Sequence, residues 1–226
     1  RDWTVNQLIA QGAPVSFTLG GIALVLAFFV GTLIGVWAAL KQNSLWDYLT
    51  MSVAMLGISI PNFVAAPLLI LLFAITLGWL PAGGWDGSAQ RLVLPAFALS
   101  LPMIAYVARI TRGSMIEVLR SSFIRTARAK GMPEHEVILR HALKPALLPV
   151  ISYLGPAAAA ILTGSVVIER IFTIPGIGSH FVQGALNRDY TLVMGVVIFY
   201  GVLIIVLNYL VDLLYAWLDP RIRYDR

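Results

Sequence analysis

The chain has 226 residues, of which 59% are hydrophobic and only 12% are charged, and its mean hydropathy is +0.84. A soluble domain averages about 45–50% apolar and about 25% charged residues, so this composition indicates an all-α integral membrane protein. The chain contains no cysteine, which excludes disulfides, iron–sulfur clusters and thiolate zinc sites. Its net charge of +5 does not indicate nucleic-acid binding, because the basic residues cluster where membrane topology requires them.

The first 14 residues are polar and mixed and do not have the pattern of a signal peptide. An apolar stretch over residues 16–40 follows, long enough to cross a bilayer with some tilt. It contains Gly31 and Gly35, four residues apart. This spacing either lets a second helix approach closely or reflects the ordinary glycine content of membrane helices.

The second predicted span covers residues 49–77 and contains Ser59-Ile-Pro-Asn62 near its middle. Proline removes a backbone hydrogen bond, so we expect a kinked helix here. Asn62 is costly against lipid and should face protein, as a hydrogen bond between helices, or a water-filled path. Residues 78–91 should lie outside the membrane, and residues 92–110 form the third predicted span.

Residues 109–149 form the one long polar segment of the chain, and the positive-inside rule places it in the cytoplasm. This segment contains three glutamates and eight of the sixteen basic residues of the chain. The basic residues are Arg109, Arg112, Arg120, Arg125, Arg128, Lys130, Arg140 and Lys144.

A helix is predicted from Ser114 to Lys130, because Met115, Leu119, Phe123 and Ala127 recur along one stripe. Gly131 follows where a helix end favours positive φ, and Pro133 suits the start of a second helix. Two helices joined at a glycine have a shape suited to docking a soluble partner. The alternative is a solvated basic loop that only sets topology.

Two further spans are predicted at residues 145–168 and 191–218, separated by an external segment over residues 169–190 that we expect to dip into the outer membrane interface. Asp212 should reach water or a basic partner rather than relay protons, since no second carboxylate lies at mid-depth. Five spans place four basic residues outside and twelve inside: Lys41, the eight above, Arg221, Arg223 and Arg226. The N-terminus is then external, so we expect a further span upstream.

Several motifs resemble those of a known family. They are Phe-Ile-Arg-Thr-Ala-Arg-Ala-Lys-Gly at 123–131, His-Ala-Leu-Lys-Pro-Ala-Leu-Leu-Pro at 141–149, Glu-x-x-Phe-x-x-Pro-Gly-x-Gly at 169–178 and Arg-Asp-Tyr at 188–190. Together they resemble permeases of binding-protein-dependent ABC importers. The general family pattern has Glu-Ala where this chain has Arg125-Thr126, and Ile-x-Leu-Pro where it has His141-Ala-Leu-Lys144. These departures are similar to the dipeptide/oligopeptide branch, and to its first permease subunit in particular.

The resemblance implies a type I importer architecture in one permease domain over residues 1–226, multi-pass in the bacterial cytoplasmic membrane, with one N-terminal helix more than this chain has. Residues 113–144, here called the elbow, would be the loop that couples to an ATPase, with contacts at Ile124, Arg125, Thr126, Ala127, Arg128, Lys130 and Gly131. The implied partners are a second homologous permease, two ABC ATPases, an extracytoplasmic peptide-binding protein and the peptide substrate. ATP and Mg²⁺ would bind the ATPases, so no cofactor, metal or catalytic residue is expected in this chain.

A peptide pathway should be lined by small and weakly polar residues, and the candidates are Ser59, Asn62, Ser100 and Tyr153. A secondary transporter is the alternative function, although the sequence has no internal repeat and no charge near the centre of a span. An enzyme is disfavoured. The sequence has no P-loop and no Gly-x-Ser-x-Gly turn, and His135 and His141 are six residues apart rather than the four of a zinc-protease helix.

Overall fold

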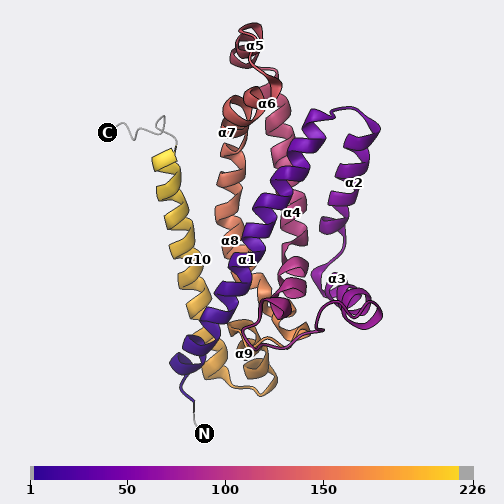
Figure 1. Ribbon diagram of the computed structural model, residues 1–226. Coiled ribbons are helices and arrows are strands. Elements are labelled where there is room, and N and C mark those ends of the chain that lie inside the picture. Colours follow the sequence, from indigo (N-terminus) through magenta and orange to yellow (C-terminus); the bar gives the residue numbers. More distant parts are fainter. Residues whose placement is uncertain (1–2, 219–226) are drawn as a thin grey trace, which may run out of the picture. The chain divides into compact units, whose positions relative to one another are not determined.

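The structure is a computed structural model that describes residues 3–218, with side chains except at 162–164, 211–212 and 214–218. Every regular element in this part of the chain is helical (Figure 1). The elements are α1 (Val5–Leu40), α2 (Leu45–Ser59), α3 (Asn62–Leu69), η1 (Ile70–Thr76), α4 (Ala89–Leu119), α5 (Ser122–Ala129), α6 (Glu134–Glu136), η2 (Val137–Ala142), α7 (Leu143–Ala146), α8 (Leu148–Ile171), α9 (Ile177–Leu186) and α10 (Tyr190–Leu218).

Three helices in the described residues are long and apolar enough to cross a membrane on their own, namely α1, α4 and α10. Two further spans are obtained if each bent helix pair counts as one: α2 with α3–η1, and α6–α7 with α8. The predicted five spans are therefore confirmed as an upper count. The predicted cytoplasmic tail and the side chain of Asp212 lie outside the described part of the chain.

The chain divides into two compact units, and three helices contribute to both. Unit 1 comprises residues 1–24, 62–99 and 155–226, and unit 2 comprises residues 25–61 and 100–154. Unit 1 thus contains α3, η1, α9 and α10, and unit 2 contains α2 and α5–α7.

In unit 1, α1 begins at Val5, eleven residues before the predicted start of the first span. Pro14 lies inside the helix, and the hydroxyl of Thr18 donates to its carbonyl at 2.7 Å. Val5, Leu8, Ile9 and Ala13 pack against a buried cluster formed by Ile177, Leu192 and Val196 of α9 and α10. From the sequence, residues 1–14 were interpreted as polar and mixed. Their apolar face can be identified only from its contacts with α9 and α10.

The external segment predicted at residues 169–190 contains regular helix. Its first three residues complete α8, and its second half forms α9. Phe172, Ile174 and Ile177 are buried against other parts of the protein. The backbone N–H of Gly84 donates to the carbonyl of Phe172 at 2.7 Å, which ties this segment to the loop after η1.

In unit 2, α1 and α4 approach each other at Gly31 and Gly35. A Cβ atom on Gly31 would lie 2.7 Å from Cβ of Val107, and one on Gly35 would lie 2.5 Å from the carbonyl oxygen of Ala108. Real Cβ atoms do not come that close to such neighbours. Of the two interpretations of this glycine pair, close helix packing is therefore the one that the structure supports.

The substitution Gly35→Ala should accordingly push α1 and α4 apart, with a loss of roughly 1–3 kcal/mol, the usual cost of overpacking. Thermal melting of the full-length protein in detergent measures this. Gly21→Ala in the same helix is the matched control, since nothing lies within 4 Å of a Cβ there, and it should melt at or above the wild-type temperature. Equal melting temperatures for Gly35→Ala and Gly21→Ala would contradict the close contact.

Candidate functional site: an elbow, a buried ion pair and a broken span

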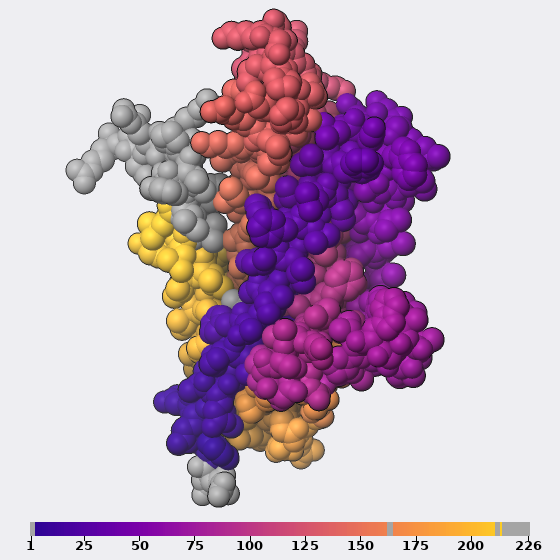
Figure 2. Space-filling view, viewed as in Figure 1, coloured from indigo at the N-terminus to yellow at the C-terminus, as the bar shows by residue number. Residues whose placement is uncertain are grey.

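The elbow comprises the last two turns of α4, then α5, a glycine turn, α6, η2 and the start of α7 (Figure 1). In the space-filling view it projects beyond the turn between α1 and α2 (Figure 2). The helix predicted from Ser114 to Lys130 is in fact two helices, because α4 ends at Leu119 and α5 starts at Ser122. Ser121 adopts an extended backbone at this break, and its hydroxyl donates to the carbonyl of Val118 at 2.6 Å.

The break changes which side chains share a face. Met115 and Ala127 are buried as predicted, but Phe123 is 49% exposed, and Ile124 takes the inward position instead. Ile124 and Ala127 pack into one cluster of buried residues with Ala39 of α1, Met115 of α4 and three residues of the segment after the turn: Val137, Ala142 and Ala146. The elbow is therefore attached to α1 and α4 through an apolar core.

The glycine turn was predicted correctly. Gly131 has φ +77°, its N–H donates to the carbonyl of Arg128 at 2.9 Å, and the N–H of Met132 donates to the carbonyl of Ala127 at 3.4 Å. Nothing lies within 4 Å of a Cβ at Gly131, so the backbone conformation alone selects glycine. Pro133 then occupies the N-cap position of α6.

The seven predicted coupling residues fall into two groups. Arg125, Thr126, Arg128, Lys130 and Gly131 are exposed, whereas Ile124 and Ala127 lie in the chain's own core. Arg128 forms two hydrogen bonds with Glu134 across the turn, at 2.5 and 3.1 Å. The bond to Glu134 raises the pKa of the Arg128 guanidinium, so this side chain stays charged.

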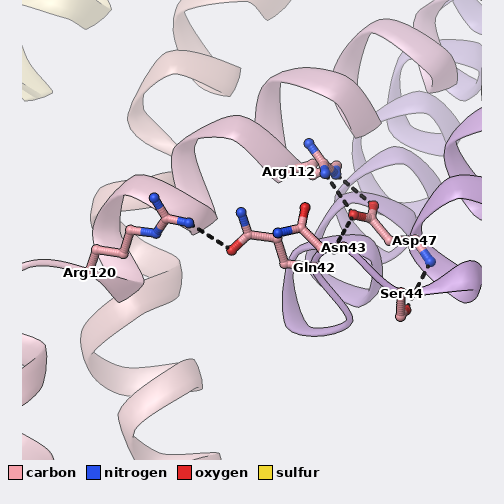
Figure 3. A network of polar contacts seen from close by, with 6 residues as sticks. All are labelled: Gln42, Asn43, Ser44, Asp47, Arg112 and Arg120. Carbon is pink, nitrogen blue, oxygen red and sulfur yellow. Dashed lines mark hydrogen bonds and ion pairs between the residues drawn. The ribbon is translucent and has the colours of Figure 1, made fainter.

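A buried ion pair lies where the α1–α2 turn meets α4 (Figure 3). Both carboxylate oxygens of Asp47 accept from Arg112, each at 2.7 Å, and the backbone N–H of Asn43 donates to Oδ2 at 2.9 Å. Ser44 caps α2 by accepting from the N–H of Asp47 at 3.3 Å. Asp47 is 1% exposed and the Arg112 side chain 27%, so the pair fastens α2 to α4 in a poorly solvated place.

Sequence reasoning missed this pair, since residues 41–48 read as a short polar turn and Arg112 as one of many topological charges. The sequence feature that could have indicated the pair is Asp47, a single acidic residue at the start of an apolar helix. A carboxylate at that depth needs a basic partner.

A second buried carboxylate, Glu169, lies in the last turn of α8 in unit 1 and is fully buried. Its Oε1 accepts from the hydroxyls of Ser16 and Ser165, both at 2.7 Å, and its Oε2 accepts from the N–H of Ser179 at 3.1 Å. Ser16 in turn accepts from the N–H of Ile177 at 2.9 Å. The Glu-x-x-Phe-x-x-Pro-Gly-x-Gly motif therefore joins α9 to α8 and α1.

The span predicted at residues 49–77 is broken rather than kinked. α2 ends at Ser59, Ile60 is extended, and α3 starts at Asn62. A residue that precedes a proline is disfavoured in the helical conformation. Ile60 precedes Pro61, so the helix ends there instead of bending. In the last turn of α2, the Ser59 hydroxyl donates to the carbonyl of Met55 at 3.1 Å.

The four pathway candidates occupy different environments. Ser59 lines a cavity between α2 and α4, and Asn62 has a buried side-chain oxygen with no partner among the described residues. Ser100 is completely buried, and the Tyr153 hydroxyl donates to Sδ of Met103 at 3.0 Å. Within the described residues, no three His, Asp or Glu side chains gather as a metal site.

The fold is that of an ABC transporter membrane subunit. It superposes on a chain of the MetNI methionine ABC transporter in an inward-facing conformation with a TM-score of 0.79, at 15% identity, covering 94% of this chain and 96% of that one. An amino acid ABC transporter gives a TM-score of 0.67 at 20% identity, covering 92% and 93%.

The sequence defines the family. Residues 31–224 match the profile of the binding-protein-dependent transport system inner membrane component, and the chain belongs to this family. The oligopeptide transport system permease protein OppB of Salmonella typhimurium is 61% identical over 225 residues, which are 99% of this chain and 74% of that protein. The dipeptide transport system permease protein DppB of Bacillus subtilis is 51% identical, over 99% of this chain and 72% of that protein.

The buried ion pair should contribute measurably to stability. Asp47→Asn leaves Arg112 without its carboxylate and should destabilise the protein by about 3 kcal/mol, the low end for breaking a buried pair. Glu136→Gln is the control, because Glu136 and Arg140 form an exposed pair at 3.5 Å and should lose less than about 1 kcal/mol. Thermal melting of the full-length protein in detergent compares them, and wild-type stability of Asp47→Asn would show that the pair is not needed.

Proposed function

We propose that this chain is a membrane-spanning permease subunit of an ATP-driven importer that translocates oligopeptides delivered by an extracytoplasmic binding protein. It would work with a second homologous permease and with two ABC ATPases that bind ATP and Mg²⁺. The observation that carries this proposal is the two-sided elbow. Family membership and the 61% identity to OppB support the importer and the peptide substrate class.

The elbow has the properties that a docking lever requires. Its inner face holds Ile124 and Ala127 in the core shared with α1 and α4, so α5 cannot shift without moving those helices. Its outer face presents Phe123, Arg125 and Lys130. A partly apolar, cationic helix of this kind suits a groove in a soluble partner with acidic residues at its rim.

We assign two different roles within the predicted coupling set. Arg125, Thr126, Arg128, Lys130 and Gly131 would contact the ATPase or shape the contact, and Ile124 and Ala127 would transmit its motion. The transmission would run through Met115 into α4, and through the Asp47–Arg112 pair into α2. Closure of the ATPases would then tilt these helices between inward- and outward-open arrangements.

For the pathway, we retain Ser59 and Asn62, which flank the break in the second span. Broken helices at membrane depth mark the substrate sites of many transporters. Ser100 and Tyr153 are the weaker candidates, because one is fully buried and the other bonds to Met103.

The secondary transporter is not favoured, because the chain belongs to a family defined by a binding-protein-dependent transport system. Glu169 is an ionisable group that this alternative could have used. Its three hydrogen bonds to Ser16, Ser165 and Ser179 instead give it a structural role at the start of α9.

Co-purification tests the proposal. The full-length protein is expressed with its chromosomal neighbours, and stoichiometric P-loop ATPases are expected to remain bound in mild detergent. Arg125→Glu should lower the bound ATPase at least about tenfold, because it reverses one charge at the interface, whereas Arg140→Glu reverses an exposed charge in η2 and should have little effect. ATP-dependent uptake of a tripeptide by proteoliposomes should fall in parallel.

Retention of the ATPase by Arg125→Glu at the wild-type level would remove the elbow from the interface. Solute uptake by the chain alone, without nucleotide, would contradict the importer and favour the secondary transporter.

A further inference from the structure

A cavity of about 570 Å³ lies between α2 and α4, entirely within unit 2. One end is polar, formed by Asp47 and Tyr48 of α2 and by Arg109 and Arg112 of α4. The rest is lined from α2 by the apolar side chains of Met51, Met55 and Leu56, together with Ser52 and Ser59. The cavity is therefore amphipathic along its length.

The cavity is lined by two arginines and only one acidic residue, so its charges do not cancel. Arg112 is neutralised by Asp47 through two hydrogen bonds of 2.7 Å. Arg109, one turn away on α4, is exposed and forms no ion pair with any residue that the structure describes. Its guanidinium lies over the ring of Tyr106, 5.2 Å from the centroid, which orients the side chain without cancelling its charge. One positive charge remains available to an anion.

The positive-inside rule places the polar end near the cytoplasmic surface of the membrane. Asp47 and Tyr48 are in the first turn of α2, directly after the turn that carries Lys41, and the positive-inside rule assigns this end to the cytoplasm. Met51, Met55 and Leu56 then follow along α2 into the span. A ligand that fills the cavity needs an anionic group at the cytoplasmic surface and an apolar portion directed toward the membrane centre.

From this arrangement we propose that the cavity binds one anionic phospholipid, with its phosphate on Arg109 and an acyl chain against Met51, Met55 and Leu56. Basic pockets between membrane helices on the cytoplasmic side suit such headgroups. A peptide is a poorer fit, because its amide groups would need hydrogen-bond partners along an apolar wall. The Ser59 hydroxyl at the deep end already donates to Met55. This proposal does not depend on the peptide substrate or on the ATPase contact.

Photo-crosslinking tests the site directly. The full-length protein, in its assembly with the subunits that co-purify with it, is placed in nanodiscs of equal parts phosphatidylglycerol and phosphatidylcholine. Either one lipid or the other carries a diazirine in its acyl chain. After illumination, mass spectrometry quantifies lipid attached to the segment 48–59. The phosphatidylglycerol probe should label this segment about fivefold more than the phosphatidylcholine probe, as expected for one arginine at the surface.

Arg109→Gln should reduce that ratio to about one. Lys41→Gln is the matched control, since it removes one positive charge from the same end of unit 2. Lys41 also resembles Arg109 in lying over an aromatic ring, because its Nζ is 5.7 Å from the centroid of the Trp37 ring. It should keep the fivefold ratio. Both residues are exposed, so both variants should fold, and melting temperatures check this.

Three results would overturn the proposal. Equal labelling by the two probes in the wild-type protein would show no headgroup selection, and an unchanged ratio in Arg109→Gln would place the selection elsewhere. Loss of labelling on addition of a tripeptide would assign the cavity to the substrate. Transport activity is measured separately, so failure of the lipid site leaves the importer proposal standing.

Discussion

The ion pair between Asp47 and Arg112 is the buried electrostatic interaction that holds α2 on α4. Removing two charges from water is costly, and only a bidentate contact with further hydrogen bonds to the carboxylate offsets that cost. The pair meets both requirements, with two bonds of 2.7 Å and a third from the backbone of Asn43. It fixes α2 on α4, while Gly31 and Gly35 allow α1 to approach α4 from another side. Three helices are thus held together by close contact at the point where α4 continues toward the elbow.

The elbow depends on its packing against α1 and α4 because its own helices are short. An isolated helix the length of α5 is not stable in water, so α5 requires tertiary contacts. Ile124 and Ala127 supply them by packing on Met115, and the positive φ of Gly131 returns the chain so that Val137 closes the same core. The exposed cations are therefore presented on a helix that is rigidly connected to the membrane spans, and rigid connection is what coupling to a partner requires.

Much of this could be predicted from the sequence, because membrane spans and glycine turns are local signals. Hydropathy located the apolar segments, and the position of Gly131 after a helical stretch predicted its turn. The break after Leu119 could not be predicted, since the periodic stripe continued through it and only the core decides that Ile124 rather than Phe123 points inward. The partners of Asp47 and Glu169 were also inaccessible. Arg112 lies 65 residues from Asp47 in the sequence, and Ser16 lies 153 residues from Glu169. No local sequence pattern indicates contacts between residues so far apart. The elbow residues themselves were found by family resemblance, but their division into inner and outer faces came from burial.

We propose that the outer face of α5 contacts an ATPase while its inner face does not. These 226 residues contain no cysteine, so a single cysteine introduced in α5 has no competing thiol among them. A bifunctional thiol–amine crosslinker is applied to the full-length protein in its co-purified assembly, with cysteine placed at Arg125 or at Ala127. The account predicts an ATPase adduct with Arg125→Cys and none with Ala127→Cys, whose side chain is buried. Equal adducts from both positions, or none from Arg125→Cys in an assembly that retains its ATPase, would contradict it.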